Sequence, residues 1–415
     1  MSVVHSGLPG TSLSRELVYV SSADPQMEQN ESPCRVLIPF ASPYLYGMER
    51  AVIETFDALR PQVTPEFQLS NMGLKRRTPV VQEIERRRFA QSFLPDHKDW
   101  PHFGKPRSFR AAMDLISAIG RGNISTLRRA FHCDVLYIPT SISMTAVLAA
   151  AYCRLRKKKV VFHFHDMRPG RWFMRLWGVL ASDFIHNADF GREYILERYP
   201  FLRSKSHMVF PYVLECATWA ALPAELEGEF AGRRNIVFVG QVSAHKGVDL
   251  LLEAFHFVAR SHPDAKLHIV GGCSETFRPK LDELLAMSNG SIKVWGYRER
   301  AWEWIRRACV YVHPTPPSRF HECFPRGALE AMSQGVPTVC FRSGGIQEIV
   351  VHGKTGLICD SETAACLATS ILRLLDDRAL RDACSREAQV QFDRKYARDT
   401  IRNQWLRFFG LCRSA

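Results

Sequence analysis

The sequence lacks the long apolar run that a membrane-spanning helix requires. Its 415 residues are 46% hydrophobic, yet no stretch approaches the roughly eighteen apolar residues needed to cross a bilayer. The N-terminus also lacks the basic start and apolar segment of a secretory signal peptide. These two absences predict a cytoplasmic protein that is not exported.

Patterns that hold metals or form disulfide frameworks are also missing. The 12 cysteines are scattered through apolar segments, with no C-x-x-C pair and no Cys/His ligand spacing. Such cysteines are typical of reduced core residues in the cytosol. We therefore expect neither a metal site nor a disulfide framework.

Acidic residues are fewer than basic ones, 42 against 55, which gives a net charge of +13. A basic protein favours an anionic partner, which could be a phosphorylated ligand, an anionic membrane or nucleic acid. No nucleic-acid recognition motif is present, and the aromatic residues fall at core positions instead of along a basic stripe. We therefore expect no nucleic-acid partner.

Two basic segments of the amino-terminal half contain aromatic residues. They are Leu74 to Arg110 and the run RPGRWFMRLWGVL at 168–180. Solvated loops and a packed helix explain both. The sharper alternative is peripheral contact with the anionic inner face of a membrane.

Repeated strand, loop and helix patterns indicate the fold class. A chain of this length exceeds one ordinary core, so we predict an α/β protein with two Rossmann-like, doubly wound domains that face each other across a cleft. The predicted parts are a poorly ordered tail at 1–32, an N-terminal domain at 33–212, a connection at 213–234, a C-terminal domain at 235–392, and a helix at 393–415 that packs back toward the N-terminal domain.

In the amino-terminal half, apolar runs predict strands at 35–40, 134–138 and 160–165 and helices at 48–59 and 144–156. The loop after the first strand contains Gly47. On the third strand, side-chain alternation places His163 and His165 on one face, with His165 at the carboxyl end. His165 is either a satisfied edge residue or part of a site, because ligands of such folds bind at the carboxyl ends of strands.

The carboxyl-terminal half repeats the pattern more regularly. Strands are predicted at 235–240, 266–270, 292–295, 310–312 and 338–341, with a helix at 247–259. Strands that alternate with crossover helices predict a parallel sheet.

The stretch Val310–Val339 carries the main candidate site. A strand leads into a proline-rich turn, Pro325 suits a first helical position, and the helix is expected to stop at Gly335. Glu322 then precedes the helix, and Glu330 lies inside it. A helix N-terminus suits a phosphate and carboxylates suit sugar hydroxyls, although a solvated helix can carry the same two glutamates.

Four runs in order give this pattern a family resemblance. The runs FVGQVSAHKGVDLLLEAF, KLHIVGG, HECFPRGALEAMSQGVPTV and SGGIQEIVVHGKTGLI resemble the carboxyl half of the family 4 glycosyltransferases, retaining enzymes of the GT-B fold. Glu322 and Glu330 fall on that family's Glu-x7-Glu motif. CDVLYIPTS and VVFHFHD resemble the amino half more loosely, with His165 at the position of the active-site histidine.

The resemblance implies a nucleotide sugar bound in the C-terminal domain and a glycan, lipid-linked or small-molecule acceptor in the N-terminal domain. It assigns the diphosphate to Lys246 and the ribose to Glu330. It assigns the binding of the donor sugar to Glu322 and to the backbone N–H groups of Cys323 and Phe324. The implied catalytic residues are His165, Lys246 and Glu322, with no metal and no cofactor. The further donor-binding positions are Gly47, Gly240, Gln241, Gly296, Tyr297, Arg298, Pro325 and Arg326.

Three departures from the family pattern leave a second function open. Gln241 stands where the family usually has an arginine beside the lysine, and Arg319 and Arg326 are the candidates to replace that charge. Pro325 replaces a common glycine, and the amino loop reads YGMER at 46–50 instead of a double-glycine turn, so Gly47 is the only residue carried over from that turn. The alternative function is therefore a catalytically inactive relative that binds nucleotide sugars.

Overall fold

The computed structural model describes residues 32–40, 47–69, 77–94, 108–139, 144–165, 170–210, 228–230, 234–286, 288 and 290–411. Residues 33–415 form one compact unit. The predicted tail, except Ser32, and most of the predicted connection at 213–234 lie outside the described residues, as does the loop before Gly47.

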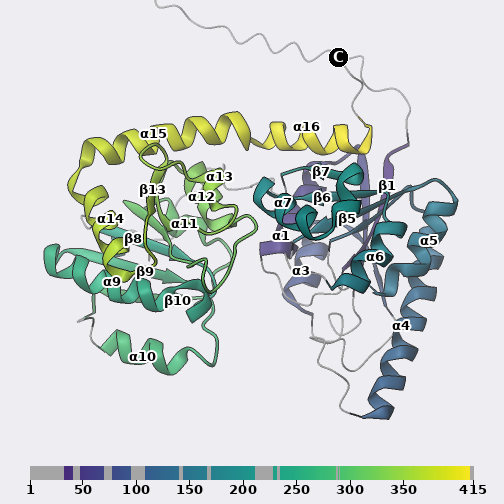
Figure 1. Cartoon of the computed structure of the whole chain (residues 1–415), viewed down its shortest axis with the longest axis horizontal. Coiled ribbons are helices and arrows are strands. Elements are labelled where there is room, and N and C mark those ends of the chain that lie inside the picture. The colour runs from purple at the N-terminus through teal and green to yellow at the C-terminus, as the bar shows by residue number, and fades with distance from the viewer. Residues whose placement is uncertain are drawn as a thin grey trace, which may run out of the picture. The chain divides into compact units, whose positions relative to one another are not determined.

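Two parallel sheets organise this unit (Figure 1). The first has the order β3-β2-β1-β4-β5-β6-β7, and the second has the order β10-β9-β8-β11-β12-β13. The strands are β1 Cys34–Phe40, β2 Val63–Leu69, β3 Ala90–Phe93, β4 Val135–Ile138, β5 Lys159–Phe164, β6 Asp183–His186, β7 Ser206–Met208, β8 Arg234–Val239, β9 Ala265–Val270, β10 Ile292–Gly296, β11 Val310–His313, β12 Thr338–Phe341 and β13 Gly356–Cys359.

In each sheet the strand order reverses beside the first strand. The chain moves outward from β1 to β3 and then crosses to β4 on the other side, and it repeats this from β8 to β10 and back to β11. This is the doubly wound arrangement, and it places a binding crevice at the carboxyl ends of the strands that flank the reversal. The predicted α/β class with two Rossmann-like sheets is confirmed.

Helices connect the strands and cover the sheets. They are α1 Gly47–Ala58, α3 Pro79–Arg86, α4 Phe109–Ala130, α5 Val147–Leu155, α6 Arg171–Leu180, α7 Asp189–Arg198, α9 Val248–Ser261, α10 Arg278–Ala286, α11 Trp302–Ile305, α12 Arg326–Ser333, α13 Ile346–Ile349, α14 Ala364–Asp376, α15 Arg378–Lys395 and α16 Arg398–Phe409, with short 3-10 turns η1 Met144–Ala146, η2 Pro200–Lys205 and η3 Ala244–Lys246.

Side-chain alternation sorts the residues of β11 between two cores. Val310 and Val312 pack with α9 and α14, whereas Tyr311 packs with α12. Because successive side chains of a strand point to opposite faces, His313 lies on the α12 face with Tyr311. This alternation brings the end of β11 to the helix that carries Glu330.

Strand β2 was not predicted from the sequence, because it contains Pro65. A proline cannot donate to a sheet ladder, so it argues against a central strand. In the structure, Pro65 pairs with Val36 of β1, but the pairing with β3 begins only at Glu66. Pro65 therefore stands where one neighbour is absent, and the missing N–H is tolerated.

The last helix, α16 (yellow in Figure 1), packs on elements of the first sheet. Trp405 is fully buried, and its indole N–H donates to the carbonyl oxygen of Phe210 at 3.0 Å. Arg402 donates to the carbonyl oxygen of Ala58 at the end of α1. Within the described part of the chain, every helix is too short or too polar to cross a bilayer.

Candidate functional site

A pocket collects residues that follow the carboxyl ends of strands in both sheets. It contains His165 from the end of β5, Asn187 from the end of β6, and Lys246 from the turn after β8. Its remaining lining is Gly47 and Met48 at the start of α1, Tyr194 on α7, and the continuous run Arg319 to Arg326 between β11 and α12.

Close backbone approaches hold the run before α12 in place. Gly344 has a φ of +59°, and a Cβ atom there would lie 2.0 Å from the carbonyl oxygen of Glu322. The same oxygen accepts a hydrogen bond from the N–H of Gly345 at 2.9 Å. Gly247 has a φ of +70°, and its Cβ would lie 1.9 Å from the carbonyl oxygen of Pro314. Only glycine combines these approaches with a left-handed backbone.

Glu322 is a carboxylate whose side chain is 12% exposed and has several polar neighbours. Lys246 forms an ion pair with its Oε1, Thr315 donates to this atom at 3.3 Å, and Nε2 of His313 lies 3.4 Å away. Burial alone would raise the pKa of Glu322, but His313 and Lys246 outweigh it and hold the pKa well below its ordinary value. Glu322 therefore stays ionised at neutral pH.

Lys246 sits at the end of the 3-10 turn that precedes α9. Its ammonium group also lies over the ring of Phe320, 4.3 Å from the centroid. The ion pair and the aromatic face hold the charge of Lys246 at the pocket wall, where an anionic ligand could reach it.

Glu330 lies one turn into α12 and is bound by Arg326 at the start of the same helix. Nε of Arg326 donates to Oε1 of Glu330 at 2.7 Å, and its NH1 lies 2.8 Å from Oε2 of Glu54 on α1. Burial opposes the charge of Arg326, but the two carboxylates raise its pKa above the ordinary value. Arg326 thus links α12 to α1, and both of its carboxylate partners are buried.

The structure corrects one detail of this helix. Pro325 was expected at the first helical position, but α12 begins at Arg326 and Pro325 is the residue before it. The carbonyl oxygen of Pro325 accepts the first helical hydrogen bonds, from Ala328 and Leu329. Burial of Leu329 and Met332, at about 1.5–3 kcal/mol for each large apolar side chain, fixes the helix on the sheet.

His165 belongs to a buried polar group that continues through β5 and β6. Nδ2 of Asn187 lies 3.3 Å from Nδ1 of His165, and the rings of His163 and His165 are 4.1 Å apart. Burial and the nearby His163 lower the pKa of His165 well below its ordinary value. His165 is therefore neutral at neutral pH.

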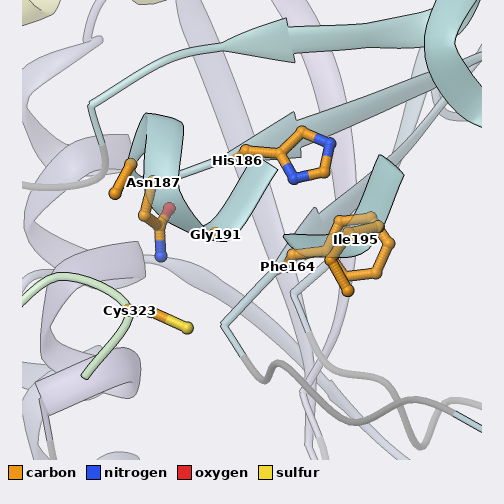
Figure 2. Close-up of a pocket in the computed structure, with 7 residues that line it drawn as sticks. Phe164, His186, Asn187, Gly191, Ile195 and Cys323 are labelled. Atoms are coloured by element: carbon orange, nitrogen blue, oxygen red, sulfur yellow. The ribbon is translucent and has the colours of Figure 1, made fainter. Parts of the chain in front are cut away.

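The turn that carries Asn187 is fastened by Glu348 of α13. Its two carboxylate oxygens accept hydrogen bonds from the backbone N–H groups of Asp189 and Phe190, at 3.0 and 2.9 Å. These N–H groups open α7, where a carboxylate is favoured by the helix dipole. A second, smaller pocket lies against the same turn (Figure 2), with the side chain of Asn187 toward Cys323 and His186 on the opposite side.

Most of the expected site residues meet in the larger pocket. Gly47, His165, Lys246, Glu322, Cys323, Phe324, Pro325 and Arg326 line it. Six others are not among its lining residues: Gly240, Gln241, Gly296, Tyr297, Arg298 and Glu330. Gly240 and Gly296 lie at the carboxyl ends of β8 and β10, and Gln241 is exposed.

Arg319 and Arg326, the two candidates to supply the positive charge that Gln241 lacks, are both paired with acidic side chains. Arg319 donates to the carboxylate of Asp249 and to the carbonyl oxygen of Ala244, and Arg326 holds Glu54 and Glu330. Both line the pocket. A phosphate would therefore compete with carboxylates for either guanidinium.

Sequence reasoning missed Glu54 and Asn187. Glu54 lies in a helix with no motif, and its contact with Arg326 spans 272 positions of the chain. Asn187 follows β6, an unpredicted strand of only four residues. The signal that could have found Asn187 is the polar pair His186-Asn187 directly after the apolar Phe184-Ile185, because polar residues at strand ends mark α/β sites. Among the described residues, no group of three or more His, Cys, Asp or Glu could hold a metal ion.

A family model matches the carboxyl-terminal part of the chain. Residues 226–391 match the family "Glycosyl transferases group 1". This glycosyl transferases group 1 segment contains Lys246, Glu322 and Glu330, and it includes all of the second sheet.

Curated relatives match over a similar length. The D-inositol 3-phosphate glycosyltransferase of Pseudarthrobacter chlorophenolicus is 31% identical over 166 residues, which cover 39% of this chain and 39% of that protein. The capsular polysaccharide biosynthesis glycosyltransferase CapM of Staphylococcus aureus is 23% identical over 167 residues, 40% of this chain and 43% of that protein. The chain thus spans about two fifths of the length of these relatives.

Solved structures extend the likeness to the whole fold. The crystal structure of Anabaena Alr3699/HepE in complex with UDP and glucose superposes with a TM-score of 0.72 at 18% identity, and it covers 91% of this chain and 100% of that one. This likeness covers both sheets and shows the fold, a GT-B architecture.

Proposed function

We propose that the chain is a retaining, metal-independent glycosyltransferase that moves a sugar from a nucleotide-sugar donor to a hydroxyl of a glycan, lipid-linked or small-molecule acceptor. The observation that carries the proposal is the Lys246–Glu322 ion pair in a pocket at the carboxyl ends of β5, β6 and β8, within a segment that matches glycosyl transferases group 1.

The donor would bind by exchanging partners with side chains that are now paired with each other. Lys246 would leave Glu322 for the diphosphate and stabilise the charge of the departing nucleotide. Glu322, with the N–H groups of Cys323 and Phe324, would accept hydroxyls of the sugar. Glu330 would take the ribose hydroxyls while Arg326 keeps it oriented.

The transfer step breaks the bond between the anomeric carbon and the phosphate oxygen and forms a bond from that carbon to the acceptor oxygen on the same face. The leaving phosphate oxygen takes the acceptor's proton. No protein base is needed in this scheme, which fits a neutral His165 and an ionised, fully engaged Glu322.

The test is a donor screen with two readouts. The purified chain is incubated with UDP-, GDP- and ADP-sugars, beginning with UDP-glucose because a solved neighbour is described in complex with it. Thermal shift reports binding, and nucleoside diphosphate release reports turnover. Turnover in excess EDTA with an unchanged anomeric configuration supports the proposal. A donor that binds but is never cleaved supports instead the inactive relative that Gln241 suggests.

The acceptor side of the proposal includes peripheral membrane contact. Helix α4 exposes Phe109, Met113 and Ile116 together with basic residues in its last turn, and Trp172 on α6 is also exposed. Apolar and basic side chains on a surface helix suit an anionic bilayer interface.

We predict that the protein floats with vesicles of anionic lipid and that this binding weakens with salt. Replacing Phe109 and Ile116 by Ser should reduce flotation, whereas Val390→Ser, an exposed apolar position on α15, should not. Equal recovery with neutral and anionic vesicles would contradict the prediction.

A further inference from the structure

Three buried polar side chains and the partly buried His165 form one hydrogen-bonded chain through the first sheet. The hydroxyl of Tyr137 contacts Nδ1 of His163, and Nε2 of His163 contacts Oδ1 of Asn187. Nδ2 of Asn187 then reaches Nδ1 of His165 at 3.3 Å. The chain begins in the core and ends at a residue of the pocket.

Strand register explains why these residues meet. Tyr137 of β4 pairs with Val161 of β5, so His163 lies two positions further along the neighbouring strand on the same face. His163 pairs with Ile185 of β6, which brings Asn187 level with His165. Alternate residues of three adjacent strands thus share one face, and Trp405 covers it, with its ring centroid 6.0 Å from that of Tyr137 and 5.8 Å from that of His163.

The buried hydroxyl of Tyr137 sets the direction of the chain. Among the described residues its only hydrogen-bond contact is Nδ1 of His163. Tyr137 is 1% exposed. A buried hydroxyl that donates no hydrogen bond lowers the stability of the fold by roughly 1–3 kcal/mol. Tyr137 therefore donates, and Nδ1 of His163 accepts.

Each later contact follows from this first one. A neutral imidazole with an accepting Nδ1 carries its proton on Nε2, so His163 donates to Oδ1 of Asn187. The amide nitrogen of Asn187 is then the donor to Nδ1 of His165. His165 accordingly carries its own proton on Nε2.

Both rings are held in the neutral form that this scheme requires. Burial lowers the pKa of His163 to about 4, and burial together with His163 lowers the pKa of His165 well below its ordinary value. Nε2 of His165 is buried and has no hydrogen-bond partner within the described ranges, although the residue lines the pocket with Lys246 and Glu322. The chain thus ends in an unused N–H donor.

We propose that Tyr137, His163 and Asn187 are positioning residues that fix His165 as the Nε2–H tautomer, so that His165 donates a hydrogen bond to an oxygen atom of the bound donor. The part that concerns the donor rests on the proposed function. The assignment of the tautomer is independent of the proposed function. An Nε2 atom that carries a proton cannot act as a general base.

The first experiment measures the tautomer without any ligand. Full-length protein labelled with ¹⁵N-histidine is examined by two-bond ¹⁵N–¹H correlation at pH 7, with His163→Gln and His165→Gln used for assignment. We expect both rings to be neutral with the proton on Nε2. Protonation of His165 at Nδ1 would mean that the chain runs in the opposite direction and would overturn the proposal.

The second experiment reverses the direction of the hydrogen bond between residue 187 and His165 and keeps the size and shape of the side chain at position 187. In Asn187→Asp, carboxylate oxygens face both rings, so His165 must move its proton to Nδ1. We expect the NMR signature of His165 to switch and nucleoside diphosphate release to fall at least ~10-fold, mainly in kcat. Tyr137→Phe should leave the fold intact and let His163 populate both tautomers.

A matched control exists in the second sheet. Asn235 accepts a hydrogen bond from Nε2 of the buried His268 at 3.1 Å, away from the pocket lining, so Asn235→Asp should leave kcat unchanged in the folded fraction. Wild-type kcat in Asn187→Asp with a switched tautomer would overturn the positioning role. If no donor is cleaved by the wild type, the donor part falls with the proposed function, and the NMR result still decides the tautomer.

Discussion

At the residue scale, the charged side chains of the candidate site are paired with one another. Glu322 is paired with Lys246, and Glu330 is paired with Arg326. Each of these two glutamates therefore has a cationic partner, and Arg326 is shared with Glu54. A donor that supplies both phosphates and hydroxyls could replace these contacts without leaving a charge buried and unpaired, which would be costly.

Lys246→Ala and Glu330→Ala are each predicted to lower turnover at least ~100-fold, because they remove a charge at the leaving group and a group that orients the donor. Initial rates of nucleoside diphosphate release measure the effect. Lys280→Ala is the control, because Lys280 pairs with Glu283 on the surface of α10. Rates within tenfold of wild type for both site variants would refute the assignment.

At the element scale, the turn between β11 and α12 depends on glycines elsewhere in the chain. Gly344 follows β12, yet its missing Cβ gives the carbonyl oxygen of Glu322 room to approach. Because the same oxygen is hydrogen-bonded to Gly345, the two segments fix each other. The position of the Glu322 carboxylate is therefore set by a loop about twenty residues away.

Gly344→Ala should displace this turn and weaken both stability and donor binding. Gly353→Ala is the matched control, because Gly353 has a similar φ of +73° but open space at its Cβ position. Both variants carry the left-handed strain of about 1–2 kcal/mol, but only Gly344→Ala adds a steric clash. Thermal unfolding and donor titration should show a larger loss for Gly344→Ala. Equal losses would mean that the close approach contributes nothing.

Regular elements were the most predictable part of the fold. The strand predicted at 235–240 is β8 within one residue at each end, because an unbroken apolar run is typical of a parallel strand that is buried on both faces. Glu322 and Lys246 were predicted from continuous motifs, and the structure places both in one pocket. Asn187 and Glu54 were not, because their roles depend on strand register and on contacts between distant segments, which local patterns do not encode.

At the scale of the whole molecule, buried neutral histidines couple stability to pH. His163 and His186 are 1% exposed, and burial lowers their pKa values from 6.5 to about 4 and about 3. In the unfolded chain these rings bind protons below pH 6.5, whereas the folded chain does not. Stability is thus full above pH 6.5 and is lost as the pH falls toward the folded-state pKa values.

We expect each such histidine to cost about 2 kcal/mol of stability at pH 5 relative to pH 8. The contribution of Glu322 has the same sign but begins only near its ordinary pKa of 4.5, below the range from pH 8 to pH 5. Thermal or denaturant unfolding across this range measures the loss, and His186→Gln should make it shallower. A flat profile from pH 8 to pH 5 would contradict the burial of neutral rings.

Trp405 links the burial of the polar chain to the last helix that is synthesised. This side chain, on the last helix, covers Tyr137 and His163 from a distance of more than two hundred residues along the chain. Because α16 follows every strand of the first sheet in the sequence, those strands are synthesised before the helix that covers this polar chain. The environment that keeps the histidines neutral is completed only when α16 has been made and has docked.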